Sequence, residues 1–288
     1  MMTRYYKVAD HVFSVSGHDD MFRLMGNYEP FVCSDTPTAP PVFQLTVEAG
    51  EAVGFEEELR QDDEGQQIGC GHNAEGQPVF EYIWANKTAG WLVCSDQYTK
   101  GRLVTTGDYQ KLAVDNALMV LFALATANQD TVLFHAAIVS WQGQGYMFLG
   151  KSGTGKSTHA RLWLKYIEGS ELVNDDNPVV RTYADGHATV FGSPWSGKTP
   201  CYRNISYPLA GIVLLSQAPY NKIHPLRGLQ AYAALVPSIS GKRWDASIAD
   251  GLHHTENALA TNIPCWHLEC LPDEEAARVC HGEMRNEK

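Results

Sequence analysis

One eight-residue segment constrains the fold of this chain more than any other: Gly150-Lys151-Ser152-Gly153-Thr154-Gly155-Lys156-Ser157. The apolar residues 146–149 before it predict a buried strand, and the spacing of apolar residues over 156–167 predicts an amphipathic helix. Glycine adopts backbone angles that turn successive N–H groups toward one anion, and the helix points the positive end of its dipole at the same place. A strand, a glycine-rich turn and a helix in this order predict an α/β fold with a phosphate-binding loop, or P-loop.

The residue types inside the P-loop match the parts of a nucleoside triphosphate. The Lys156 ammonium supplies a full positive charge to the outer phosphates, and the Ser157 hydroxyl is suited to bind Mg²⁺. We therefore predict ATP and Mg²⁺ as cofactors. The alternative, a glycine loop that matches the pattern by chance, leaves the strand and the helix around it unexplained. The residues expected to bind the nucleotide are Gly150, Ser152, Gly153, Thr154, Gly155, Lys156, Ser157 and Thr158.

Two adjacent carboxylates, Asp175 and Asp176, follow the predicted strand 171–174. Neighbouring strands of an α/β sheet end together, so this pair is expected to lie beside the P-loop. One carboxylate can then hold the metal, while the other takes a proton from an attacking hydroxyl. The alternative is that Asp-Asp-Asn-Pro forms a turn without catalytic function, since these residues favour turns.

Three further residues are candidates for the same site. His135 belongs to the predicted strand 131–141, which precedes the P-loop strand. The loop 192–200 carries Lys198, and Arg203 follows it. A triphosphate in an acidic protein needs extra positive charge near the transferring phosphoryl group, and these two cations are the best candidates outside the P-loop. The alternatives are a core histidine and two surface cations.

The first hundred residues are typical of a β-rich region. Short segments rich in β-branched and aromatic residues predict antiparallel strands at 11–15, 42–47, 80–84 and 91–94, with turn-forming residues between them, 69–76 included. The acidic stretch 56–64 is interpreted as a solvated helix end and loop.

The predicted helices suggest where the chain divides. A helical pattern runs from about residue 108 to residue 128, and further helices are predicted at 229–235, at 245–259 and from 272. We therefore expect a β-rich N-terminal region over 1–107 and an ATP-binding catalytic domain over 108–288.

Charge and hydropathy exclude several kinds of partner. The net charge is −11, whereas binding a polyanion requires clustered Lys and Arg, so we expect neither a nucleic-acid nor a membrane partner. The amino terminus lacks the apolar segment of a secretory signal, and the longest apolar run, 117–127, is shorter than a membrane span. We expect a cytoplasmic protein.

The cysteines do not indicate a disulfide framework or a zinc site. There are seven, an odd number at scattered positions. Cys265, His267 and Cys270 share a predicted strand, but their spacing puts Cys270 on the opposite face from the other two. No zinc is predicted.

Three segments together resemble the C-terminal catalytic domain of HPr kinase/phosphorylase and the wider phosphoenolpyruvate carboxykinase-like fold. In that family a His-containing strand precedes the P-loop strand by a short glycine turn, and an Asp-Asp pair follows the P-loop helix. The matching segments, in the same order and with similar spacing, are 133–137, 150–157 and 172–176.

The resemblance implies an α/β (α+β) fold, a P-loop kinase domain preceded by the β-rich region. It implies that Lys156 and the loop amides hold the phosphates and that Ser157 and Asp176 hold Mg²⁺. It also implies that Asp175 is the general base and that His135 lines the active site near the γ-phosphate. The implied activity is ATP-dependent transfer of the γ-phosphoryl group to a serine-like hydroxyl in a small molecule, peptide or protein, by a homo-oligomer.

The chain departs from true HPr kinases in two respects. It lacks their later glycine-rich signature loop, and its N-terminal half does not resemble their regulatory domain, so HPr is not the predicted acceptor. A carboxykinase would need more cationic residues and a larger domain than this chain offers. A nucleotide-dependent regulatory protein without phosphotransfer is the alternative from another functional class.

Overall fold

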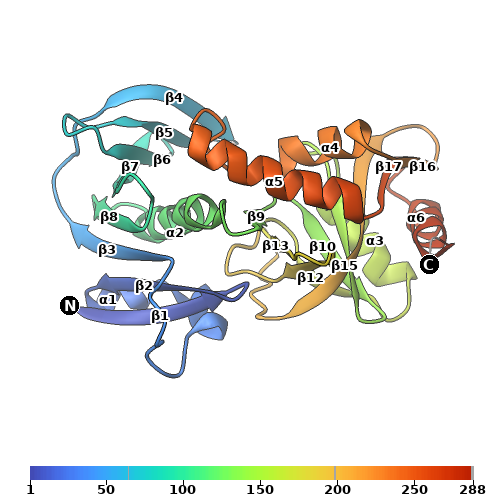
Figure 1. Cartoon of the computed structure of the whole chain (residues 1–288), viewed down its shortest axis with the longest axis horizontal. Helices are drawn as coiled ribbons and strands as arrows, with labels where there is room; N and C mark the ends of the chain where they lie inside the picture. Colours follow the sequence, from blue (N-terminus) through green and yellow to red (C-terminus); the bar gives the residue numbers. More distant parts are fainter. Residues whose placement is uncertain (64, 198, 287–288) are drawn as a thin grey trace. The chain divides into compact units, whose positions relative to one another are not determined.

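The chain forms two compact units, Met1–Thr126 and Ala127–Lys288 (Figure 1). The computed structural model describes residues 1–63, 65–197 and 199–286. Each unit combines helices with a large sheet, so the mixed α/β architecture predicted from the sequence is confirmed. The boundary differs from the expected 107/108 because helix α2 (Gln110–Thr126) packs on strands of the first unit.

In the described residues of the first unit, eight strands form one sheet in the order β1-β2-β3-β8-β7-β6-β5-β4. The pairing is antiparallel except at β3, which runs parallel to both of its neighbours, β2 and β8. This corrects the prediction of a purely antiparallel region: the long link between β2 and β3, which contains α1 (Asp19–Phe22) and a 3₁₀ helix (Gly26–Phe31), permits a crossover. The strands are β1 (Met2–Val8), β2 (His11–Gly17), β3 (Phe43–Ala49), β4 (Glu56–Asp63), β5 (Gln66–His72), β6 (Pro78–Trp84), β7 (Lys87–Cys94) and β8 (Lys100–Thr105).

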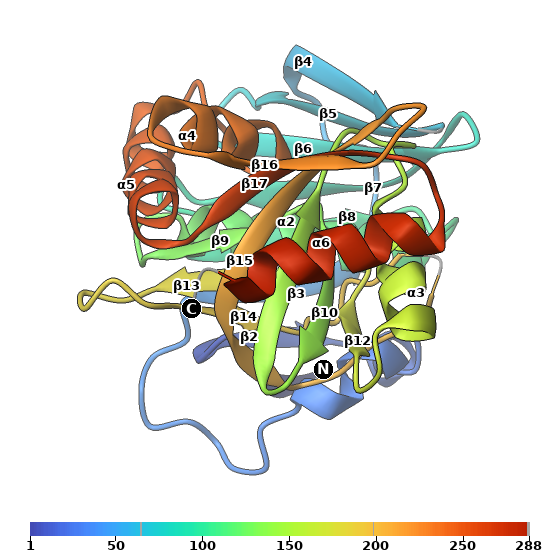
Figure 2. The same ribbon diagram turned by 90° about the vertical axis from the view of Figure 1, so that its right-hand side faces the viewer.

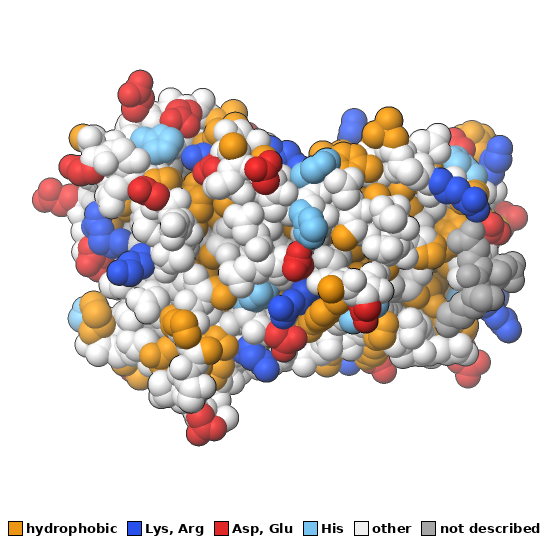
Figure 3. All heavy atoms as spheres, in the orientation of Figure 1, with side chains coloured by type: hydrophobic (Ala, Val, Ile, Leu, Met, Phe, Trp, Pro, Cys, Tyr) orange, Lys and Arg blue, Asp and Glu red, His pale blue; other side chains and the backbone are white. Residues whose placement is uncertain are grey.

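The acidic stretch of the first unit is a strand, not the helix end and loop expected from its charge. It forms β4, the last strand in the order of the sheet, and residues 56–62 are exposed. Charged side chains at a sheet edge discourage pairing with other chains, so an edge strand can be this polar. Figure 3 shows acidic side chains gathered at the upper left, where β4 and its neighbouring turns lie in Figure 1.

The second unit contains a mixed sheet in the order β12-β10-β11-β15-β14-β13-β9, and β17 also pairs with β15 and β16. Strands β11, β15 and β17 are parallel to one another. The long strand β15 pairs with β14 through its first residues and with β17 through its later ones. The strands are β9 (Thr131–Leu133), β10 (Ala137–Trp141), β11 (Gln144–Leu149), β12 (Glu171–Asn174), β13 (Val179–Thr182), β14 (Ala188–Phe191), β15 (Ser206–Gln217), β16 (Lys222–Leu226) and β17 (Cys265–Cys270).

The predicted strand 131–141 is interrupted, which places His135 between two strands rather than within one. β9 pairs with β13, whereas β10 pairs with β11 and β12, so the chain changes partners between them. At the interruption Phe134 forms an isolated bridge with Ile239, and the His135 N–H donates to the Ser238 carbonyl at 2.6 Å.

The helices of the second unit form close to where the sequence predicts them. They are α3 (Lys156–Tyr166), α4 (Leu229–Leu235), a 3₁₀ turn (Val236–Ser238), α5 (Ala246–Asn262) and α6 (Glu274–Asn286). The Asp245 carboxylate caps α5 by accepting from the Ser247 N–H at 3.2 Å. In the described part of the chain, no helix has both the length and the apolar character needed to cross a membrane.

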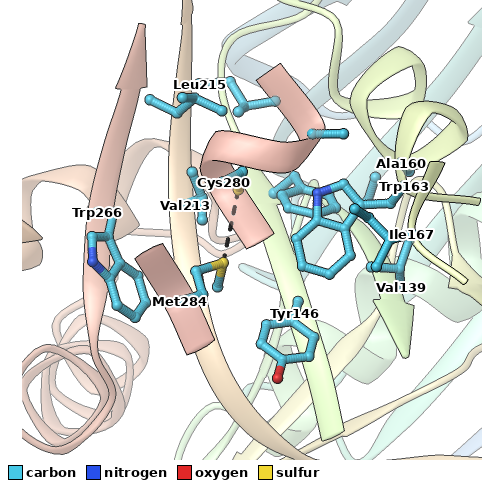
Figure 4. Packing of buried hydrophobic residues seen from close by; sticks show 14 residues of the cluster. Val139, Tyr146, Ala160, Trp163, Ile167, Val213, Leu215, Trp266, Cys280 and Met284 are labelled. Carbon is cyan, nitrogen blue, oxygen red and sulfur yellow. Dashed lines mark hydrogen bonds between the residues drawn. The ribbon is translucent and has the colours of Figure 1, made fainter. Parts of the chain in front are cut away.

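Helices α3 and α6 cover one face of strands β10, β11, β15 and β17 (Figure 2). The centre of this core is the fully buried Trp163 of α3, whose ring lies 5.3 Å from that of Tyr146 and 5.5 Å from that of Phe148. Figure 4 shows the Trp163 indole between the strands and α6, with a contact from Cys280 to Met284 alongside. Truncating a buried Trp to Ala costs about 3–5 kcal/mol, so this ring anchors α3 firmly.

The buried His159 of α3 makes the stability of this unit depend on pH. Its Nε2 accepts from the Trp163 indole N–H at 3.2 Å, and burial lowers the pKa of His159 to about 4. Between pH 6.5 and 4 the unfolded chain therefore binds a proton that the folded state excludes. The contribution of His159 to the free energy of unfolding is thus complete above pH 6.5. It decreases by about 3 kcal/mol as the pH falls to 4 and below.

We therefore expect His159→Phe, which keeps an aromatic ring against Phe148 and Trp163, to weaken the acid dependence. Denaturant titrations of wild type and variant from pH 7 to pH 4 measure this. The variant loses the acceptor for the Trp163 N–H, which lowers its stability equally at every pH. Parallel pH profiles for the two proteins would show that His159 does not titrate as stated.

Candidate functional site

The predicted P-loop is the segment between β11 and α3, and three of its glycines have a positive φ. Gly150, Gly153 and Gly155 have φ values of 152°, 77° and 110°, which L-residues with a side chain rarely adopt. At Gly150 a Cβ atom would lie 3.2 Å from the Leu215 carbonyl oxygen, so the glycine is also needed for space. The loop ends at Gly155, the N-cap of α3, where the first backbone N–H groups of the helix have no partner within the helix.

Two side chains donate hydrogen bonds to the backbone carbonyls of this loop. The Lys156 ammonium donates to the carbonyls of Gly150 at 2.9 Å and Lys151 at 3.4 Å, and only 7% of the residue is exposed. The Gln217 amide, at the end of β15, donates to the carbonyls of Gly153 and Thr154 at 3.3 and 3.5 Å. The loop is therefore tied both to its own lysine and to a neighbouring strand.

A pocket of about 650 Å³ adjoins the P-loop. Four of the predicted nucleotide-binding residues, Gly153, Thr154, Gly155 and Thr158, form part of its wall. The rest of the lining is largely apolar and comes from α3 and from the ends of β15 and β17. Ser152 is exposed at the tip of the loop, and Ser157 is half-buried on the first turn of α3. The other lining residues include Leu162, Leu215, Pro219, Cys270, Leu271 and Pro272.

The acidic pair lies at the same edge of the sheet as the P-loop. β12 pairs antiparallel with β10, and β10 pairs antiparallel with β11, so β12 and β11 run in the same direction. Asp175 and Asp176 follow the end of β12, and Gly150 follows the end of β11. Since β10 is the strand between them, the two backbone segments are about 10 Å apart, which is two strand spacings.

Asn174 shapes the backbone around this pair. Its Oδ1 accepts from the Asp176 N–H at 2.9 Å, and its Nδ2 donates to the Ser193 hydroxyl at 3.1 Å and to the Trp195 carbonyl at 3.3 Å. The residue is fully buried. The first bond is the turn that Asn favours, so the turn and the acidic pair are one structure and not alternatives. The second and third bonds bring the segment 193–197 against the pair.

The Asp175 carboxylate is surrounded by donors from this segment and from Thr199. It accepts from the Ser196 hydroxyl at 2.8 Å and from the N–H groups of Gly197 at 3.0 Å and Thr199 at 3.3 Å. Only 7% of Asp175 is exposed. A Cβ atom on Gly197 would lie 3.1 Å from the Asp176 Cβ, so the glycine lets the backbone cross over the pair.

Asp176 connects the pair to His135. The Asp176 Oδ1 lies 3.2 Å from the His135 Nδ1, and its Oδ2 accepts from the Asn177 side chain at 2.8 Å. The Ala136 N–H donates to the Asp176 carbonyl at 2.8 Å, which fixes the start of β10 to the end of β12. The histidine side chain is 40% exposed, so it faces the outside of the sheet edge and is not a core histidine.

Of the two predicted cations, Lys198 lies outside the described residues. The Arg203 guanidinium donates to the Leu172 carbonyl at 2.7 Å and to the Glu171 carboxylate at 2.9 Å, at the start of β12. Asp175 lies at the other end of this strand, about 10 Å away by the rise per residue. Arg203 is therefore not among the residues that the structure brings to the acidic pair.

The residues available for a metal are oxygen donors. Within 1–63, 65–197 and 199–286, no group of three or more His, Cys, Asp or Glu side chains is arranged to hold a metal ion. Mg²⁺ does not need such a group, because it usually takes one or two protein oxygens and completes its shell with phosphates and water. The Ser157 hydroxyl and the Asp176 carboxylate are oxygen ligands of the type that Mg²⁺ takes.

Several residues of this edge were not predicted as site residues, namely Asn174, Ser193, Ser196, Gly197 and Gln217. Asn174 stands next to the acidic pair in the sequence, and an Asn followed by two Asp residues is a recognisable turn signal. The others contact the site only through the tertiary fold, and no spacing in the sequence indicates them.

Two comparisons with known proteins do not identify a family for this chain. No curated protein matches the chain. Among solved structures, the Hpr(Ser) kinase/phosphatase from Coxiella burnetii is similar over 54% of this chain and 95% of that one, with 12% sequence identity and a TM-score of 0.33. Since a TM-score this low does not establish a common fold, the chemistry of the site rests on its own geometry.

A protein-family model gives a clearer result. The model for "SynChlorMet cassette protein ScmC" matches residues 103–271, which is more than half of the 288-residue chain. The matched region includes His135, the P-loop, the acidic pair and the segment 193–197. The chain therefore belongs to the family of the SynChlorMet cassette protein ScmC.

Proposed function

We propose that the protein is an ATP-dependent, Mg²⁺-requiring phosphotransferase that acts on a serine-like hydroxyl. The observation that carries this proposal is the shared sheet edge: the P-loop follows β11 and the acidic pair follows β12, with β10 between them. A phosphate-binding loop alone supports nucleotide binding and nothing narrower. A carboxylate pair within about two strand spacings of it supplies the two groups that phosphoryl transfer needs besides the phosphate cradle.

The nucleotide would bind with its phosphates in the P-loop and its nucleoside in the adjoining pocket. The loop supplies N–H groups, the dipole of α3 and the Lys156 ammonium, all of which favour an anion. The pocket of about 650 Å³ has the volume of a small-molecule site and shares Gly153 and Thr154 with the loop. Its apolar residues, such as Leu162 and Pro219, suit the flat face of a base.

The metal would be held by Ser157 and Asp176 together with the phosphates. A divalent ion held there would neutralise charge that develops on the transferring phosphoryl group. His135 contacts the same Asp176 carboxylate through Nδ1. This contact orients the ring and leaves its Nε2 side for a phosphate oxygen.

Asp175 would act as the general base. The acceptor hydroxyl gives its proton to the Asp175 carboxylate, its oxygen bonds to the γ-phosphorus, and ADP leaves with the electron pair of the broken bond. Because three donors now surround this carboxylate, an acceptor hydroxyl must replace one of them. The domain would thus be an HPr kinase-like P-loop kinase of the phosphoenolpyruvate carboxykinase-like type, with an acceptor of its own.

A nucleotide-dependent regulatory protein that transfers nothing is the second candidate. A regulatory site has less need of a carboxylate beside the outer phosphate than a kinase has. Incubation with ATP labelled at the γ-phosphate and a panel of serine peptides and small hydroxyl compounds separates the two functions. Transfer of label to an acceptor supports the kinase, and slow hydrolysis alone supports the regulatory protein.

We expect Lys156→Ala to bind ATP about 10- to 100-fold more weakly, since a hydrogen bond to a charged group contributes about 1.5–3 kcal/mol. Isothermal titration calorimetry measures the affinity. The matched control is Lys165→Ala, which removes an exposed cation from the last turn of the same helix. Thermal unfolding checks that both variants are folded, and wild-type affinity in Lys156→Ala would refute the phosphate site.

We expect Asp175→Asn to lower phosphoryl transfer by about 10²- to 10⁴-fold while ATP still binds, because the amide cannot accept the proton. Release of ADP in the presence of the acceptor measures the rate, and calorimetry measures binding. Asp185→Asn is the control, since Asp185 lies exposed in the turn between β13 and β14. Unchanged turnover in Asp175→Asn would rule out its role as the base.

A further inference from the structure

The Asp175 carboxylate already accepts a hydrogen bond from a hydroxyl of its own chain, that of Ser196. The Ser196 Oγ lies 2.8 Å from the Asp175 Oδ1, which is the contact that a general base makes with the hydroxyl it activates. The other two donors, the N–H groups of Gly197 and Thr199, cannot act as nucleophiles. Ser196 therefore occupies the position that the proposed function assigns to the acceptor.

The surroundings of Ser196 keep its hydroxyl at this position. The segment 193–197 is anchored at its beginning, where the Ser193 hydroxyl donates to the Asn177 carbonyl at 2.6 Å. Trp195 is buried, and its carbonyl accepts from the Asn174 side chain. Ser196 itself is half-buried. An anchored segment presents its hydroxyl to the carboxylate with little loss of entropy, which is the advantage of an intramolecular acceptor.

The hydroxyl has a second acceptor within reach. The Ser196 Oγ lies 2.6 Å from the Thr199 carbonyl oxygen, yet a serine hydroxyl has only one proton to donate. The proton therefore points to one of the two oxygens at a time, and the orientation toward Asp175 is the one that the transfer requires. Gly197 crosses over Asp176, the residue joined to His135, so Ser196 lies at the sheet edge that the P-loop shares.

From this geometry we infer that Ser196 is a phosphoryl acceptor of the protein itself, an inference that rests on the proposed function. The Ser196 Oγ bonds to the γ-phosphorus of a nucleoside triphosphate. The bond from that phosphorus to the oxygen bridging the β and γ positions breaks, and its electron pair leaves on the nucleoside diphosphate. The Ser196 proton passes to the Asp175 carboxylate. The products are phosphoserine at position 196 and the nucleoside diphosphate.

The test uses the full chain with Mg²⁺ and ATP labelled at the γ-phosphate, without any added acceptor. We expect one phosphoryl group per chain by intact mass, located at Ser196 by peptide mass spectrometry. Ser196→Ala should carry no label and still bind ATP by calorimetry. Ser206→Ala, which removes an exposed serine at the start of β15, should be labelled like the wild type.

Lys156→Ala and Asp175→Asn should both lack the label, and label on either of them would show that a contaminating kinase is responsible and that the inference is wrong. A wild-type chain that binds ATP but carries no phosphoryl group at Ser196, or carries it at another residue, also overturns the inference and leaves the nucleotide site standing. A chain that binds no ATP overturns the proposed function as well. Calorimetry on the same samples distinguishes these two failures.

Discussion

The packing of α3 through Trp163 is the interaction on which the rest of the candidate site depends. The indole fills the space between β10, β11 and α6, and its N–H bonds to His159 one turn earlier in the helix. This contact fixes the axis and the rotation of α3, and therefore the direction in which its first N–H groups point. The P-loop spans only the gap from Leu149 to Lys156, so it has little freedom once the strand and the helix are fixed.

Asn174 has the corresponding role on the other side of β10. A buried amide must satisfy its donors and acceptor, and this one does so with the Asp176 backbone, Ser193 and the Trp195 carbonyl. The turn after β12 and the segment 193–197 are thereby joined through one side chain. The carboxylate pair thus belongs to a junction that several hydrogen bonds hold in place, as the role proposed for Asp175 requires.

The parts of the site that sequence could predict are those made by neighbouring residues. The glycines of the predicted P-loop, the strand before it and the helix after it are local features. The expectation that neighbouring strands end together led to the shared edge with Asp175, although β10 lies between the two strands. Ser196 and Gln217 reach the site through tertiary contacts, so their position in the sequence carries no signal. Arg203 is a candidate because of its charge, but its guanidinium donates to Glu171 and to the Leu172 carbonyl and not to the acidic pair.

Two of the strands that the sequence does not predict, β5 and β16, contain residues that usually mark turns. β5 includes Gly71, where a Cβ atom would lie 1.8 Å from the Glu56 carbonyl oxygen, next to the irregular register between β4 and β5. Glycine there permits a close approach of two backbones and does not end the strand. β16 contains Pro225, which is tolerated because this strand lies at an edge of the sheet beside β17.

The Lys156 contacts also bear on the thermodynamics of anion capture. A loop that had to order itself around each incoming anion would lose about 1–2 kcal/mol of conformational entropy for every residue whose backbone becomes fixed. Here the ammonium already donates to the carbonyls of Gly150 and Lys151, and the Gln217 amide donates to those of Gly153 and Thr154. Under the proposed function, an anion in the loop would take the place of these carbonyls as the acceptor of the Lys156 ammonium. Little of the binding free energy would then be lost to ordering the loop.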